Sequence, residues 1–276
     1  MTQALQNTQQ PKSRLYLIHT AIYAFLFYYF AHQYFGINHA ADTHYSGDNQ
    51  LHAYEETIAK QNHLLSAIMN KEPPRAEAGV RKFYQQDFLH FHQVVPLNKM
   101  VADPNIERFL DSHDITTDSE YPEYVDDEAS LIYLAQKYGP FIEKGTANDK
   151  RMYVRWVDDD RGYGLYSSIN IPGGSVLGVF GGVITNESYT TDYMWSYKGN
   201  VLDDQGNKID LGIDAKAYGN WFRFANHHDE PNARGIYVPY KNRWYVMYVA
   251  QENIPADQQI YVSYGYNYWT QRTKIL

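Results

Sequence analysis

The stretch that decides the fold is GNWFRFANHHDEPNA, residues 219–233. It brings an arginine, two histidines and three asparagines close together and ends on the pair Pro231 and Asn232. Each residue has an ordinary explanation by itself, because Asn226, for example, could be a structural amide that bonds to backbone groups. The stretch gains weight from two further segments of the second half of the chain, one before it and one after it.

The segment before it is rich in glycine. RGYGL (residues 161–165) is followed by INIPGG (169–174) and VLGVFGG (176–182). Two glycines one residue apart, Gly162 and Gly164, let a backbone approach a ligand closely and expose its N–H groups. The third glycine of a dinucleotide fingerprint is missing and no obvious helix follows, so the sequence disfavours a Rossmann site.

The segment after it is ADQQIYVSYGYNYW, residues 256–269. A short hydrophobic run leads to Tyr264 and Tyr266, and Trp269 follows. Between these segments, β-branched and aromatic runs alternate with Gly, Asn, Asp and Pro turns, which is typical of a β-rich module. The predicted strands are Met152–Val157, Ser175–Val179, Ile236–Tyr240, Trp244–Ala250 and Ile260–Tyr264.

The order and spacing of the three segments resemble those of the SET-domain protein lysine methyltransferases. The stretch 219–233 is similar to the RFxNHxxxPNA signature of that family, and the resemblance covers residues 151–270. It implies an α+β fold, in which a β-rich SET domain (a β-clip with a pseudoknot) follows a mainly helical N-terminal region. In that pseudoknot the strand that carries Asn226 would pass under the C-terminal segment.

The resemblance also implies a function, the methylation of a protein lysine with S-adenosyl-L-methionine as the cofactor. Tyr264 would be the catalytic residue and direct its hydroxyl at the reacting centre. The cofactor would be held by Gly162, Tyr163, Gly164, Asn226, His227 and Trp269. The channel for the substrate lysine would be lined by Phe180, Tyr237 and Tyr266.

Some positions depart from the family pattern. His228 and Asp229 replace a Ser-Cys pair, and Gln258 and Gln259 replace an acidic pair. Phe180 stands where relatives often have tyrosine, which removes a hydroxyl from the channel and would loosen control over the number of methyl groups added. These departures leave a second hypothesis open, a SET-like module that binds a peptide or partner without catalysis.

Composition narrows the chemistry. The chain has 276 residues and no cysteine, which excludes disulfides, thiolate nucleophiles and cysteine-ligated metals, including the zinc lobes of many histone methyltransferases. His90 and His92 could offer two nitrogens to a metal, but no third ligand is near, so we expect packing and predict no metal site. The net charge is -8. We therefore expect no direct nucleic-acid binding and favour a basic peptide substrate such as a histone tail.

The first half is organised differently. After a polar tail (1–14), residues 15–37 are long and apolar enough to cross a bilayer, with Lys12 and Arg14 before them. A buried, aromatic-rich helix explains the same stretch equally well. The sequence therefore does not decide whether residues 15–37 span a membrane, or whether the protein is membrane-associated, secreted or intracellular. Within the helical region 38–150, helices are predicted at Asn49–Asn70, Val80–His92 and Ala129–Tyr138.

Two surface features complete the prediction. The acidic residues between Asp118 and Glu128 are expected to form a solvated loop or face. Residues 186–213 would be the variable insert of the family and form one wall of the peptide groove. Within this insert, residues 192–195 could offer a strand edge to a substrate backbone.

Overall fold

The computed structural model describes residues 81–88, 92–146, 149–186 and 192–269, without the side chains of Tyr266 and Asn267. The helices are α4 (Pro104–Ser112), α5 (Glu128–Lys144) and α6 (Tyr266–Trp269), with short 3-10 turns at Gln85–Asp87, Ile115–Thr117, Tyr121–Glu123 and Trp221–Phe224. The first strands are β1 (Val95–Pro96), β2 (Val101–Ala102), β3 (Met152–Asp158), β4 (Gly162–Ser167), β5 (Val176–Val179), β6 (Val183–Thr185) and β7 (Met194–Ser196). The remaining strands are β8 (Gly212–Asp214), β9 (Tyr218–Gly219), β10 (Asn226–His227), β11 (Ala233–Tyr240), β12 (Arg243–Ala250) and β13 (Tyr261–Val262).

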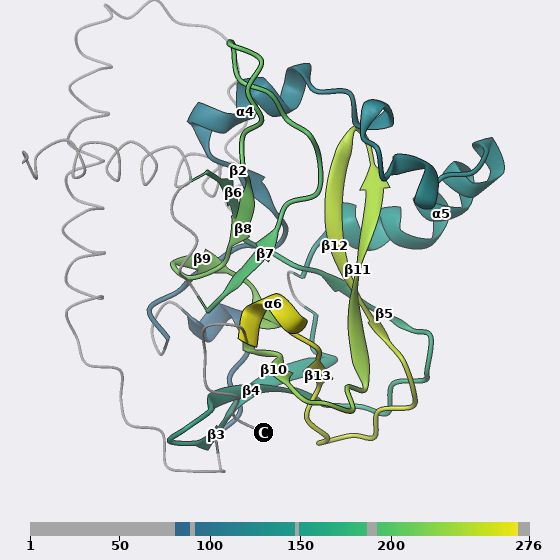
Figure 1. Cartoon of the computed structure of the whole chain (residues 1–276). Helices are drawn as coiled ribbons and strands as arrows, with labels where there is room; N and C mark the ends of the chain where they lie inside the picture. Colours follow the sequence, from purple (N-terminus) through teal and green to yellow (C-terminus); the bar gives the residue numbers. More distant parts are fainter. Residues whose placement is uncertain (1–80, 89–91, 147–148, 187–191, 270–276) are drawn as a thin grey trace, which may run out of the picture. The chain divides into compact units, whose positions relative to one another are not determined.

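The longest strands, β11 and β12, form an antiparallel hairpin, and β12 pairs in turn with β5 (Figure 1). Lys241 and Asn242 make the hairpin turn, both with positive φ, the backbone conformation that suits the twist of two-residue hairpins. Side chains alternate along β12. Trp244, Val246 and Tyr248 face the main core, whereas the residues between them face α5. The period-2 pattern thus gives the sheet two buried faces.

Helix α5 covers one face of this sheet. Tyr138 and Ile142 pack against the valines and Met247 of the three strands. Asp127 caps the helix by accepting a hydrogen bond from the Ser130 N–H, and Gly145 ends it at φ 63°. The helix predicted at 129–138 is therefore confirmed, and it continues to Lys144.

Smaller sheets surround this unit. One contains β2, β6, β8 and β7 in that order, with β7 at the edge, and β3 pairs with β4. Strand β10 runs parallel to β13 although the long β11–β12 hairpin separates them in the sequence. This pairing sets Asn226 beside the closing segment of the chain. All five predicted strands are found, although the last is shortened to Tyr261–Val262.

Two other expectations for the first half are confirmed only in part. In the described part of 80–92, Gln85–Asp87 and Phe88 are helical, whereas the residues before them are extended, because Phe83 exchanges two backbone hydrogen bonds of 2.8 Å with Val154. Asp118 is not solvated. It is 2% exposed and accepts hydrogen bonds from the Trp244 indole and the Asn200 N–H, each at 2.7 Å.

The described part of 38–150 is mainly helical, with α4 and α5, and also contains the two-residue strands β1 and β2. The predicted segments 15–37 and 49–70 lie outside the described residues. Among the residues that are described, no helix has the length and apolar character needed to cross a membrane.

Candidate active site

Two cavities meet at Tyr264. The first has a volume of about 550 Å³ and opens between β7, β11 and α6, and the second, of about 510 Å³, lies between the β3–β4 turn and α6. Both are lined by Asp192, Tyr193, Arg223, Tyr264 and Tyr268. A molecule in either cavity would therefore reach the same group of side chains.

The phenol of Tyr264 is held firmly at this junction. Its hydroxyl donates to the Ala225 carbonyl at 3.0 Å, and its backbone N–H donates to Nδ1 of His227 at 3.2 Å. Its ring stacks on Trp269 at 6.0 Å and meets Tyr268 edge-on at 4.6 Å. Burial raises the pKa of the Tyr264 phenol well above its usual value, so the phenol is protonated at neutral pH.

The second cavity gathers most residues that the sequence suggested for cofactor binding. Gly162, at φ 66°, begins β4 and lines the cavity together with Tyr163. Asn226 and His227 come from β10, and the Asn226 amide donates to the Tyr163 carbonyl at 3.2 Å, which ties the glycine turn to that strand. Trp269, from α6, places its ring 4.9 Å from that of His227.

Gly164 is different, since it lines neither of these two cavities. A Cβ at this position would lie 2.4 Å from Nε2 of Gln259 and 2.9 Å from Val157. Its missing side chain makes room for a buried glutamine, whose Oε1 accepts hydrogen bonds from the hydroxyls of Tyr166 and Tyr261. The structure thus gives Gly164 a packing role between β4 and the segment before β13.

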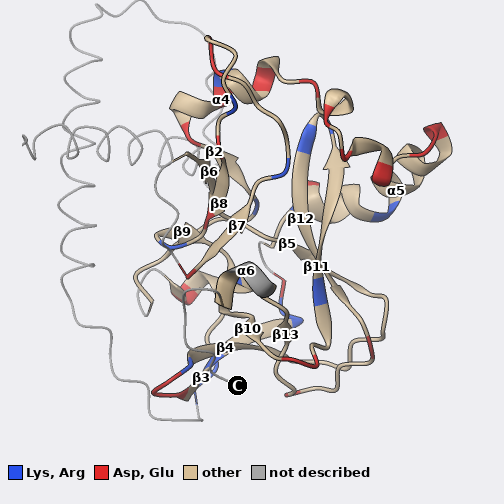
Figure 2. Cartoon of the chain, viewed as in Figure 1, with Lys and Arg blue, Asp and Glu red and all other residues tan. Residues whose placement is uncertain are grey.

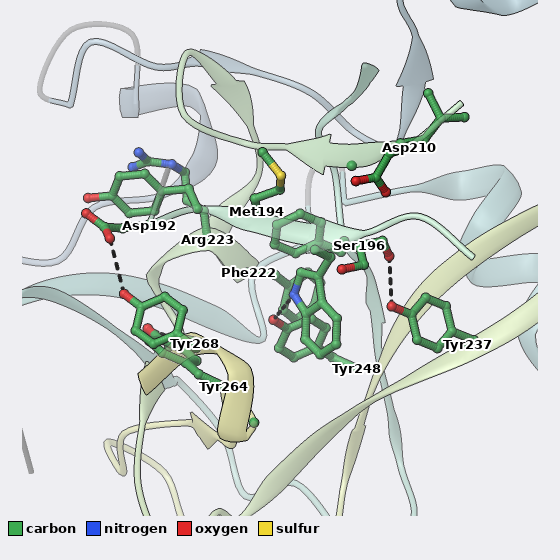
Figure 3. Close-up of a pocket in the computed structure, with 17 residues that line it drawn as sticks. Asp192, Met194, Ser196, Asp210, Phe222, Arg223, Tyr237, Tyr248, Tyr264 and Tyr268 are labelled. Atoms are coloured by element: carbon green, nitrogen blue, oxygen red, sulfur yellow. Dashed lines mark hydrogen bonds between the residues drawn. The ribbon is translucent and has the colours of Figure 1, made fainter. Parts of the chain in front are cut away.

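Arg223 is a site residue that the sequence analysis did not assign. It lies between the cavities, and its guanidinium sits 3.7 Å over the ring of Tyr193 (Figure 3). It donates to the backbone carbonyls of Ala215 at 2.7 Å and Lys216 at 3.3 Å. Burial lowers the pKa of Arg223, but an arginine remains cationic at neutral pH. The site therefore contains a largely desolvated positive charge.

Aromatic rings form the wall of the first cavity. Phe180 and Phe222 both stack on Tyr248, with centroid distances of 6.2 and 4.6 Å. The Tyr248 hydroxyl accepts a hydrogen bond of 3.1 Å from the indole of Trp195. Tyr237 also lines this cavity, and its hydroxyl donates to the Ser196 carbonyl at 2.7 Å. Of the predicted channel residues, Phe180 and Tyr237 line the first cavity. The side chain of Tyr266 is not among those that the structure describes.

The insert supplies the opposite wall, as the sequence analysis expected. Residues 192–196 line the first cavity, and β7 is the edge strand of its sheet. Asp192 accepts a hydrogen bond of 3.3 Å from Tyr268, and Asp210 lies on the other side of the opening (Figure 3). The first cavity thus combines an aromatic interior with a carboxylate at either side of its opening.

The described residues thus form a β-rich domain in which two cavities share a group of side chains around Tyr264. The family model of the SET domain matches residues 162–265, and these residues form a SET domain. The fold class and the SET domain suggested by the sequence are therefore confirmed. A comparison with curated proteins found no match.

One solved structure has a similar fold, and two others match shorter parts of the chain. ATXR5 in complex with histone H3.1 has a TM-score of 0.50 and 16% identity, over 66% of this chain and 86% of that one. SUVH6 of Arabidopsis thaliana in complex with SAM has 29% identity and a TM-score of 0.33, over 40% and 26%. The polycomb repressive complex 2 of Chaetomium thermophilum has 18% identity and a TM-score of 0.38, over 45% and 16%. The chain thus spans about a quarter or less of the last two proteins.

Proposed function

We propose that this protein is an S-adenosyl-L-methionine-dependent N-methyltransferase that acts on a lysine of another protein. The observation that carries the proposal is that two cavities meet at the Tyr264 phenol. Transfer of a methyl group is an in-line displacement, so the donor and the attacking amine must reach one point from opposite sides. Holding both in that geometry supplies much of the catalysis.

The second cavity fits the donor. When bound, S-adenosyl-L-methionine supplies a methyl group that is already activated by a sulfonium cation. Arg223 offers a desolvated positive charge to the methionine carboxylate, and Trp269 offers a ring face to the adenine. The backbone of Gly162 and Tyr163 and the pair Asn226 and His227 would hold the rest of the molecule.

Tyr264 would orient the reactants rather than remove a proton. Its phenol stays protonated because of burial, and its hydrogen points to the Ala225 carbonyl. The lone pairs of the oxygen therefore face the junction, where they can accept an amine N–H or a polarised C–H group. A fixed acceptor of this kind costs no reorganisation when the methyl group moves.

The first cavity fits a lysine side chain. Its aromatic walls would desolvate the amine, which lowers the pKa of a lysine and favours the neutral, nucleophilic form. Phe180 offers no hydroxyl to this amine, and the hydroxyl of Tyr237 is already hydrogen-bonded to the backbone of β7. Tyr266 remains a predicted channel residue.

The opening of the first cavity favours a basic peptide, such as a histone tail. Asp192 and Asp210 lie on its two sides and would attract Lys or Arg residues next to the target lysine. Within the described part of the chain β7 is the edge strand of its sheet and could add a substrate strand by backbone hydrogen bonds, although its Ser196 carbonyl already accepts one from Tyr237.

A methyl-transfer assay tests the proposal. Full-length protein is incubated with methyl-labelled S-adenosyl-L-methionine and mixed basic proteins, and methyl-lysine is read by mass spectrometry. Tyr264→Phe should lower the rate by about 100-fold, in the range found when one stabilising hydrogen-bond group is removed from an active site. Tyr153→Phe is the matched control, because this buried tyrosine bonds Asp257 and lines neither cavity.

Equal rates for the wild type and Tyr264→Phe would remove Tyr264 from the mechanism. Binding of the cofactor and a peptide without any labelled lysine would instead support the second hypothesis, a SET-like binding module. Loss of activity in both variants would point to a folding defect, which circular dichroism of each variant would show.

A further inference from the structure

The first turns of α5 carry an unusual exposed apolar group. Leu131, Ile132 and Tyr133 are 40%, 48% and 55% exposed. They are three of the five large hydrophobic side chains that are exposed in the described part of the chain. This end of the helix extends beyond the edge of the sheet that the rest of α5 covers (Figure 1). We call these three residues the α5 tip.

The pattern of the α5 tip differs from that of a surface helix. Consecutive helical residues point about 100° apart, so three in a row cover more than half of the circumference. An ordinary surface helix has one apolar stripe that faces the core, as the part of α5 around Tyr138 and Ile142 does. A helix end that is apolar on several sides is suited to burial, and contiguous exposed apolar groups often mark interaction sites.

Acidic residues border the α5 tip. In Figure 2 the segment that leads into the helix is marked red at its Asp and Glu positions. Glu123, Asp126, Asp127 and Glu128 are exposed, and within the described part of the chain none of them takes part in an ion pair. Asp127 also caps the helix. The charges of Glu123, Asp126 and Glu128 thus remain available to a partner.

We propose that the α5 tip docks a partner protein through amphipathic helices whose apolar face is bordered by Lys and Arg. Charge complementarity selects this occupant. A second copy of the chain would bring two acidic borders together, and an anionic lipid surface would repel them. A basic helical partner would bury the apolar residues and neutralise the acidic border at the same time.

A synthetic amphipathic helix tests this. The probe is a fluorescent Leu/Lys peptide of about 20 residues, long enough to be helical, and a Leu/Glu peptide with the same apolar face is its control. Binding to the full-length protein is followed by anisotropy. The Leu/Lys peptide should bind at least 10-fold more tightly than the Leu/Glu peptide, and the difference should shrink in high salt.

Two triple variants separate the contribution of the apolar residues to peptide binding from that of the acidic residues. Replacement of Leu131, Ile132 and Tyr133 by Gln, a good helix former, should weaken binding of the Leu/Lys peptide by at least 10-fold. Replacement of Glu123, Asp126 and Glu128 by their amides should remove the salt dependence. The matched control replaces Ile169 and Leu202, which are 47% and 51% exposed elsewhere, by Gln and should leave binding unchanged.

Several outcomes would overturn the proposal. Equal affinity for the Leu/Lys and Leu/Glu peptides would show that the α5 tip does not select a basic helix. An equal loss of peptide affinity in the Ile169 and Leu202 control variant would show that binding is not specific to the α5 tip. Light scattering that finds a dimer in the wild type and a monomer in the Gln variant would assign the α5 tip to a second copy. Peptide binding that appears only after removal of residues 1–80 would assign it to the chain's own N-terminal region.

Discussion

His92 makes the stability of the protein sensitive to acid. Its imidazole is surrounded by the rings of Phe83, Phe88, Tyr163 and Phe224, with centroid distances of 4.4 to 5.5 Å. Its Nε2 is buried and has no hydrogen-bond partner among the described residues. Burial, with a further contribution from the charge of Arg223, lowers the pKa of His92 to about 4 from an ordinary value of 6.5.

The direction and size of the effect of pH on the unfolding free energy follow from this difference in pKa. Between pH 6.5 and 4 the unfolded chain binds a proton at His92 that the folded chain does not, so stability falls as the pH falls. Because one pKa unit corresponds to about 1.36 kcal/mol, the loss attributable to His92 is about 2 kcal/mol at pH 5 and about 3 kcal/mol by pH 4.

His92→Phe isolates this contribution, since phenylalanine keeps a ring in the cluster but does not titrate. Urea unfolding of both proteins from pH 8 to pH 4.5 should give a gap in unfolding free energy that grows by about 2 kcal/mol in favour of the variant by pH 5. An NMR titration of the wild-type imidazole should show no protonation above pH 5. Parallel stability curves, or protonation near pH 6.5, would refute the reasoning.

Two further substitutions test individual contacts. Trp244→Phe removes a hydrogen-bond donor from the buried carboxylate of Asp118 and should lower the unfolding free energy, measured by urea unfolding, by about 2 kcal/mol. A loss below about 0.5 kcal/mol would mean that water replaces the indole as donor. Gly235→Ala places a Cβ 2.5 Å from Cη2 of Trp195, so the indole must move and release Tyr248. Its peptide KM should rise about 10-fold while calorimetry finds unchanged affinity for S-adenosyl-L-methionine, and weakened cofactor binding would contradict the division between the two cavities.

Local patterns were enough to predict the strands, whereas the candidate site residues came from the resemblance to the SET family. The β-branched and aromatic runs that predict β11 and β12 are a property of neighbouring residues. The position of Tyr264 beside His227 could be expected only from the resemblance to the SET family, because β10 and β13 meet across a long hairpin. No local signal brings them together.

The residues that sequence reasoning missed depend on contacts between distant segments. Asp118 looked solvated within an acidic run, but Trp244 and Asn200 reach it from elsewhere in the chain. Gly164 matched a ligand-binding pattern, but a glycine does not reveal whether a ligand or a side chain such as Gln259 fills the space beside it. The partly buried charge of Arg223 could have been suspected from an arginine set among aromatic residues in the stretch 219–233.

The central claim is that the two cavities form one reaction centre at Tyr264. A crystal structure with S-adenosyl-L-homocysteine and a lysine peptide tests it most directly. The account predicts the nucleoside in the cavity of Asn226 and His227, the lysine among Phe180 and Tyr237, and the sulfur and amine facing each other beside the Tyr264 hydroxyl. Both ligands in one cavity, or either of them bound away from Tyr264, would contradict it.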